Sequence, residues 1–76
     1  MTKVNISLNS IDKVKSFVND ISKYPYDFDL VSGRYVIDAK SIMGIFSLDL
    51  SSPIELNIHT NDKIEEILKD LKPYIV

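Results

Sequence analysis

The most apolar stretch of the chain reads Ala39-Lys40-Ser41-Ile42-Met43-Gly44-Ile45-Phe46-Ser47-Leu48-Asp49-Leu50. Ile42, Ile45 and Leu48 recur at three-residue steps along one side of a helix, and Met43, Phe46 and Leu50 form a second apolar stripe. A short surface helix needs only one stripe for the core, so we expect the other to be buried by another segment or offered to a partner. Ser41 stands where this helix begins. Its hydroxyl can cap the unpaired backbone N–H groups there, and the helix dipole would tolerate a phosphate.

Outward from this helix, the spacing of apolar residues predicts the element order β-α-β-β-α-β-α. Strands are expected over residues 3–8, 27–31, 34–38 and 54–59, with Ser32-Gly33 as the tight turn between the second and third. Helices are expected over 11–21, with its apolar side on Ile11, Val14, Phe17, Val18 and Ile21, and over 64–71. Thr60-Asn61-Asp62 is expected to cap the last helix, Pro73 to end it, and Tyr74-Ile75-Val76 to pack back on the core.

Hairpin signals mixed with helices indicate an α+β fold, an open-faced two-layer sandwich in which helices cover one face of an antiparallel sheet. The chain has 76 residues, so we expect a single domain over 1–76. Hydrophobic residues make up 45% of it, which argues for a globular chain over a disordered one.

Composition also narrows the classes of partner and ligand. The formal charge is −2 and no basic block is present, which argues against nucleic acid as a partner. No apolar run approaches the ~20 residues of a membrane span, and no signal peptide is evident, so we expect a cytoplasmic protein. The chain has no cysteine, no metal-ligand spacing and no glycine-rich phosphate loop, so we expect neither metal nor cofactor.

The element order and the block Lys40-Ser41-Ile42-Met43-Gly44 resemble HPr, the histidine-containing phosphocarrier of the bacterial sugar phosphotransferase system. The family segment reads close to N-G-K-x-V-x-x-K-S-I-M-G-V-M-S-L, and residues 32–48 resemble it with one extra residue between Val36 and Lys40. Upstream, Ser22-Lys23-Tyr24 matches a family S-K-Y or S-K-F at an ungapped distance. The resemblance spans nearly the whole chain and implies an HPr-like fold with a four-stranded sheet covered on one face by three helices. It also implies a carrier or regulatory protein, not a catalyst.

One motif of the family is missing. HPr carries its phosphoryl group on the histidine of G-I-H-A-R-P-A, at the start of the first helix. Counting back from Ser22 places that histidine on Ser10, the arginine on Asp12 and the proline on Lys13. A serine hydroxyl without an adjacent base is a weak nucleophile, and Asp12 would repel a phosphate that an arginine would hold. The chain's one histidine, His59, ends a strand that we expect to run antiparallel to the first, so it should sit at the rim and not carry phosphate.

Two family sites are retained. The resemblance implies that Ser41 is a candidate for regulatory phosphorylation, because HPr proteins of low-GC Gram-positive bacteria are modified at this serine. It implies that Ile42, Met43 and Phe46 belong to the apolar patch that docks on protein partners, together with the start of the first helix at Ser10. Met43 and Phe46 lie off the Ile45–Leu48 stripe, so they are the better candidates for an exposed patch.

Three functions remain open at this point. The first is a non-catalytic HPr-like module that binds proteins of the phosphotransferase or carbon-regulation type, as a monomer or weak dimer. The second is an active phosphocarrier in a sugar phosphotransferase relay that uses a non-standard residue. The third is a degenerate domain kept for oligomerisation.

Overall fold

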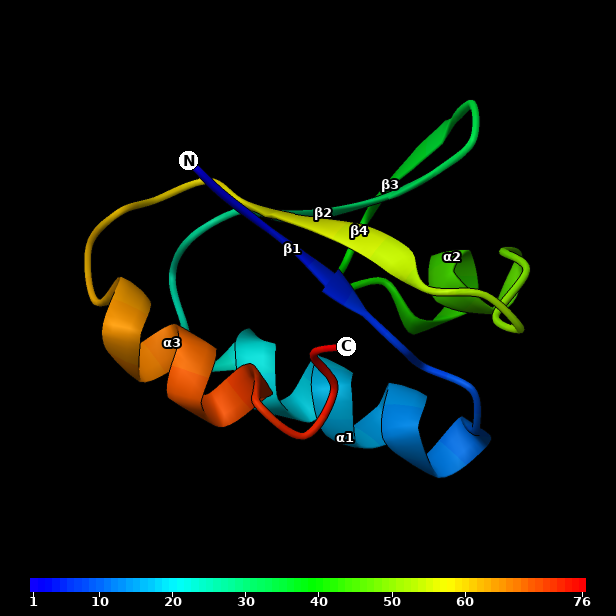
Figure 1. Cartoon of the computed structure of the whole chain (residues 1–76), viewed down its shortest axis with the longest axis horizontal. Coiled ribbons are helices and arrows are strands. Elements are labelled where there is room, and N and C mark those ends of the chain that lie inside the picture. The colour runs from blue at the N-terminus through cyan, green and yellow to red at the C-terminus, as the bar shows by residue number, and fades with distance from the viewer.

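The computed structural model describes residues 1–76 and contains four strands and three helices in the predicted order (Figure 1). They are β1 (Thr2–Ile6), α1 (Ile11–Ser22), β2 (Phe28–Ser32), β3 (Tyr35–Asp38), α2 (Ile42–Phe46), β4 (Ile54–Ile58) and α3 (Ile64–Leu71). No helix is both long and apolar enough to cross a bilayer.

The strands form one antiparallel sheet in the order β1-β4-β2-β3. β4 lies between β1 and β2, so the first and last strands of the sequence are neighbours, with Thr2 opposite Ile58 and Ile6 opposite Ile54. Figure 1 shows the helices on one side of the sheet, with α1 and α3 below it and α2 beneath the end that carries β3. The predicted α+β open-faced sandwich is confirmed.

The core lies between the sheet and the helices, and its 17 buried residues are all apolar and form one cluster. β4 contributes Ile54, Leu56 and Ile58, which alternate inward as period-two patterning requires. α1 contributes Val14, Phe17 and Ile21. The expectation that Ile11 faces the core is wrong: its side chain is 62% exposed, because this first helical residue lines a surface groove.

Two local details differ from expectation. The hairpin turn is Gly33-Arg34, one residue later than predicted, since Ser32 pairs with Tyr35. Gly33 has φ +59°, which a two-residue turn with glycine in its first position requires. The cluster at residues 60–62 does not cap α3, because the Thr60 hydroxyl accepts from Asp62 N–H, and Lys63 enters the helix in the left-handed region at φ 54° with no side-chain cap.

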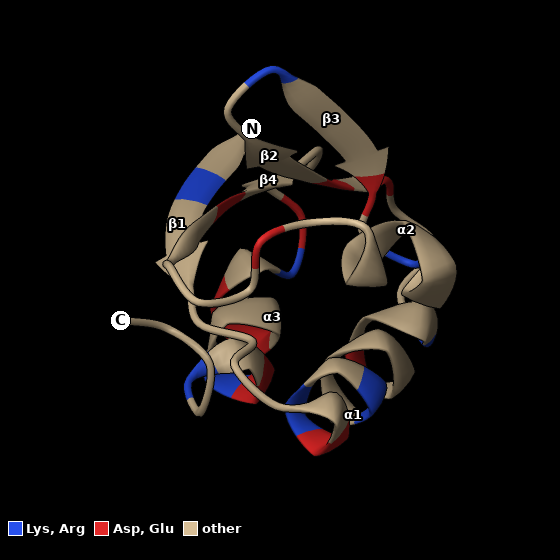
Figure 2. Ribbon diagram, turned by 90° about the vertical axis from the view of Figure 1, so that its right-hand side faces the viewer, with Lys and Arg blue, Asp and Glu red and all other residues tan.

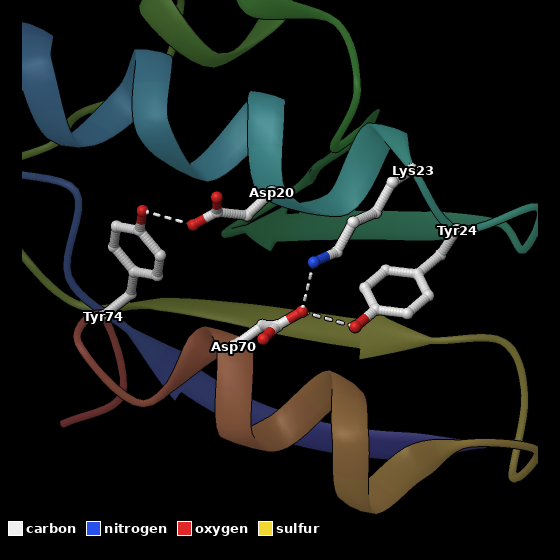
Figure 3. Close-up of polar contacts among 5 residues, drawn as sticks. All are labelled: Asp20, Lys23, Tyr24, Asp70 and Tyr74. Carbon is white, nitrogen blue, oxygen red and sulfur yellow. Dashed lines mark hydrogen bonds and ion pairs between the residues drawn. The ribbon is translucent and has the colours of Figure 1, made fainter.

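α1 and α3 are joined by a reciprocal pair of tyrosine–carboxylate bonds (Figure 3). Tyr24, just after α1, donates its hydroxyl to Asp70 of α3 at 2.5 Å, and Lys23 Nζ reaches the same oxygen at 2.8 Å. Tyr74, just after α3, donates to Asp20 of α1 at 2.8 Å. Burial raises the pKa of Tyr24 and raises the pKa of Tyr74 to about 12, and the neighbouring carboxylates add to both effects. Each helix is therefore held by an aromatic residue that follows the other.

The segment after α3 packs back through Tyr74 and through its backbone, whereas the side chains of Ile75 and Val76 are exposed. Tyr74 is buried and contacts Phe17 edge-to-face, with ring centroids 5.6 Å apart. Ile75 bridges to Ile6, and Val76 N–H donates to the Asn5 carbonyl. These contacts cover the end of β1 at its outer edge.

Candidate functional site

α2 begins and faces as its sequence predicts. The Ser41 hydroxyl accepts from Gly44 N–H at 3.2 Å, and so caps the helix while Ser41 itself remains exposed. Ile45 is fully buried and Leu48 is nearly so. Met43 is 77% exposed and Phe46 41%, so the second apolar stripe of this helix faces solvent.

The start of α2 is tied to the end of α1 by Lys40. Its ammonium donates to the Tyr24 carbonyl at 2.7 Å and lies over the Phe28 ring. Asp38 closes the turn between β3 and α2: one carboxylate oxygen accepts from Lys40 N–H, and its carbonyl accepts from Ser41 N–H. Lys40 thus holds Ser41 at a fixed place relative to α1.

The helix is shorter than the apolar run that predicts it. It ends at Phe46, and the Ser47 hydroxyl turns back to the Gly44 carbonyl at 2.6 Å. Beyond it, Asp49 accepts from both the hydroxyl and the N–H of Ser51, which lowers the pKa of its carboxyl. This turn brings Leu50 and Ser51 back beside the start of α1.

The start of α1 carries the residues that align with the family's missing motif. The Ser10 hydroxyl accepts from Lys13 N–H at 3.1 Å and caps the helix. Asp12 lies in the first turn, where the helix dipole favours a carboxylate. Ser10 and Asp12 are both exposed, and each has a structural role that needs no phosphate.

A surface groove joins the two helices. Its volume is about 480 Å³, and it is lined from α1 by Asn9, Ser10 and Ile11 and from α2 and its following turn by Phe46, Leu50 and Ser51. Of the residues expected in the site, the structure brings Ser10 and Phe46 together here. Ile42, half-buried, packs against the core. Ser41 and Met43 lie elsewhere on α2, outside the groove lining.

The groove also contains residues that sequence reasoning did not select. Asn9 and Ser51 carry no local signal beyond turn propensity. Ile11 did have a local signal. It is a large apolar residue directly after the N-cap, so it occupies the first helical position, where its side chain lies at the end of α1 and not over the sheet.

His59 lies at the opposite end of the sheet from Ser10. It follows Ile58, which pairs with Thr2, whereas Ser10 follows Ile6, which pairs with Ile54. The length of β4, about 13 Å, therefore separates the two ends. His59 Nε2 contacts Asp29 at 2.6 Å, on the rim of a second hollow of about 320 Å³ lined by Asp27, Asp29, Asp38, Phe28 and His59 itself. No three His, Cys, Asp or Glu side chains are grouped so as to hold a metal ion.

Solved structures of other proteins share this fold. No protein-family model and no curated sequence matches the chain. A crystal structure of HPr-C-His from Thermoanaerobacter tengcongensis aligns over 96% of this chain and 89% of that one, at 29% identity and a TM-score of 0.78. The phosphocarrier protein HPr from Bacillus anthracis aligns over 99% and 94%, at 28% identity and a TM-score of 0.74. A histidine-containing phosphocarrier protein of Mycoplasma shares the fold at 14% identity, with a TM-score of 0.69 over 95% and 86%.

These likenesses extend over nearly the whole chain, so they concern the complete sandwich and not one of its parts. They agree with the motif resemblance at residues 32–48, which rests on sequence and not on shape. The shared motif and the shared fold together support membership of this chain in the HPr family of phosphocarrier proteins.

Proposed function

We propose that this chain is a non-catalytic member of the HPr family that binds protein partners of the phosphotransferase or carbon-regulation type. Binding uses the face formed by the start of α1 and by α2. The observation that carries the proposal is the groove between these helices, with Ile11 and Phe46 exposed on its two sides. Met43 extends the apolar surface along α2. Exposed apolar side chains gathered on one face of a small domain are typical of a docking surface.

The chemistry at the start of α1 supports docking without phosphoryl transfer. A phosphocarrier needs a nucleophile with a labile phosphorylated form, which an imidazole supplies and a serine hydroxyl does not. The Ser10 hydroxyl is engaged as a helix cap, and no histidine or carboxylate contacts it as a base. His59, the one imidazole, is at the far end of the sheet and pairs with Asp29.

A regulatory role for Ser41 is the second part of the proposal. Its hydroxyl is exposed and held in place by the Lys40 contacts. A phosphate there would lie at the first turn of α2, close to the exposed Met43 and Phe46 side chains. Phosphorylation would add negative charge beside the docking face and so change which partners bind.

A labelling assay separates docking from transfer. The protein is incubated with phosphoenolpyruvate and the first enzyme of the relay, alongside a histidine-containing HPr as a positive control. We expect no acid-labile label on this chain, because acid lability is the mark of a phosphoramidate. Acid-labile label that disappears in His59→Gln would establish an active carrier and refute the proposal.

A binding titration tests the face itself. The first enzyme of the relay is titrated with the wild type, with Phe46→Asp and with Glu65→Lys, a charge reversal on the exposed side of α3, away from this face. Phe46→Asp should weaken binding at least about tenfold, since it places a charge in the centre of an apolar contact. Glu65→Lys should leave binding unchanged. Equal binding by all three would place the docking surface elsewhere.

A further inference from the structure

β1 and β3 form the two outer edges of the sheet (Figure 2). Only β1 has another segment of the chain against its outer side. β1 is covered at one end by the residue 74–76 segment, through Val76 N–H on the Asn5 carbonyl and the bridge of Ile75 to Ile6. Lys3 stands on the rest of this edge, and an edge lysine discourages pairing with another strand. β3 forms the other edge, and no segment of the chain pairs with its outer side.

β3 is suited to pairing. Its sequence, Tyr35-Val36-Ile37, is aromatic and β-branched and contains neither lysine nor proline. Tyr35 is 69% exposed and Val36 63%. The two-residue turn closes on Tyr35, so alternation along the ladder directs the N–H and C=O of Val36 away from β2 and toward the open edge.

Charged residues at the two ends of β3 would favour one register of pairing with another strand. Arg34 precedes β3 and Asp38 ends it, and neither forms an ion pair within the chain. Figure 2 shows the basic colour at the turn before β3 and the acidic colour where the strand ends. A two-fold axis that is perpendicular to the sheet and passes midway between two Val36 residues places each Val36 opposite its copy and Tyr35 opposite Ile37. In that same register Arg34 of each copy meets Asp38 of the other.

From this self-complementarity we infer that β3 is an interface for a second copy of this chain, which pairs antiparallel about Val36. The two Val36 residues exchange their free N–H and C=O groups, and the two four-stranded sheets join into one. Two symmetric Arg34–Asp38 pairs set the register. Strands of four residues bury little area, so the dimer is weak and reversible.

Sedimentation and light scattering at protein concentrations up to about 1 mM test the inference, because small interfaces associate in that range. The wild type should form a reversible dimer. Val36→Pro removes the outward N–H and should give a monomer, and edge strands tolerate proline at such a position. Far-UV circular dichroism at micromolar concentration checks that the variant is folded. A monomeric wild type, or a dimer that persists in folded Val36→Pro, would overturn the inference.

A charge exchange tests the register, and circular dichroism checks the fold of each variant because Asp38→Lys also removes the hydrogen bond from Lys40 N–H to the Asp38 carboxylate. Arg34→Asp sets two carboxylates opposite each other and suits the turn, where Gly-Asp is favoured. Asp38→Lys sets two cations opposite each other. Each variant alone should dissociate at least about tenfold more readily than the wild type.

An equimolar mixture of the two variants should form a heterodimer. The carboxylate introduced at position 34 of one chain then faces the ammonium introduced at position 38 of the other, and the unchanged Arg34 faces the unchanged Asp38. A mixture that stays monomeric would refute the pairing.

Discussion

Replacing Tyr74 by phenylalanine should make the protein less stable at neutral pH and relatively more stable in alkali. Tyr74 is 6% exposed and donates its hydroxyl to Asp20 at 2.8 Å. Burial, followed by that hydrogen bond, raises its pKa from an ordinary 10.0 to about 12. At pH 7 the substitution removes one hydrogen bond to a carboxylate that is partly exposed and therefore screened by solvent, which costs about 1 kcal/mol.

The alkaline effect follows from proton linkage. Between pH 10 and 12 the unfolded chain has lost the Tyr74 proton while the folded chain keeps it, so the free energy of unfolding falls as pH rises through this window. The rise in pKa corresponds to at most about 3 kcal/mol. Because the Asp20 carboxylate is only partly buried, solvent screening reduces the effect to about 1–2 kcal/mol.

Urea unfolding at pH 7, 9, 10, 11 and 12 measures the difference between the wild type and Tyr74→Phe. The two proteins differ only at position 74, so the difference between their free energies of unfolding reports on Tyr74. We expect the wild type to be more stable up to about pH 10, and this advantage to vanish or reverse by about pH 12. Tyr35→Phe serves as the matched control, since Tyr35 is 69% exposed and makes no side-chain hydrogen bond. An advantage of the wild type that stays constant from pH 8 to 12 would refute the reasoning.

Three further predictions concern stability. Asp70→Asn should flatten the acid dependence of unfolding: hydrogen bonds from Lys23 and from a tyrosine hydroxyl hold the Asp70 pKa below its ordinary 3.8, so their stabilisation is present above pH 4 and is lost as the pH falls further. Ser41→Ala removes the cap of α2 and should cost about 1 kcal/mol in urea unfolding at pH 7, with no change in the slope against urea. Ile45→Ala should cost about 2–5 kcal/mol by the same measurement, because Ile45 is fully buried, whereas Met43→Ala on the exposed side of the same helix should cost under about 0.5 kcal/mol.

The spacing of apolar residues in the sequence predicts the fold, because the buried residues of each strand and helix recur at the period of that element. Ile54, Leu56 and Ile58 alternate with partly exposed neighbours and all face the core. The same pattern separates buried Ile45 from exposed Met43 within five residues of helix. Ser41 is predictable as well, since a cap needs only its own helix to act.

Contacts between residues that are far apart in the sequence could not be predicted from the spacing of apolar residues. Tyr24 meets Asp70 across 46 positions of sequence, and Tyr74 meets Asp20 across 54. Nothing in the local pattern distinguishes these tyrosines from ordinary core aromatics, because their partners are chosen by how α1 lies against α3 (Figure 3). The groove could not be predicted either, because it forms only where Leu50 and Ser51 fold back beside the start of α1.

The charges at the start of α1 bear on whether this end of the helix can hold a phosphate. The free N–H groups at the start of α1 amount to about half a positive charge. Asp12 contributes a full negative charge in the same turn and Lys13 a full positive one, so the two side chains largely cancel. An arginine in place of Asp12 would instead add to the helix end and hold a phosphate through paired N–H donors. What remains on this face is the apolar surface of Ile11, Met43 and Phe46, whose contribution to binding grows with buried area and does not depend on an anion. In the function we propose, this face contacts a protein partner through apolar surface, with no phosphoryl group needed on either partner.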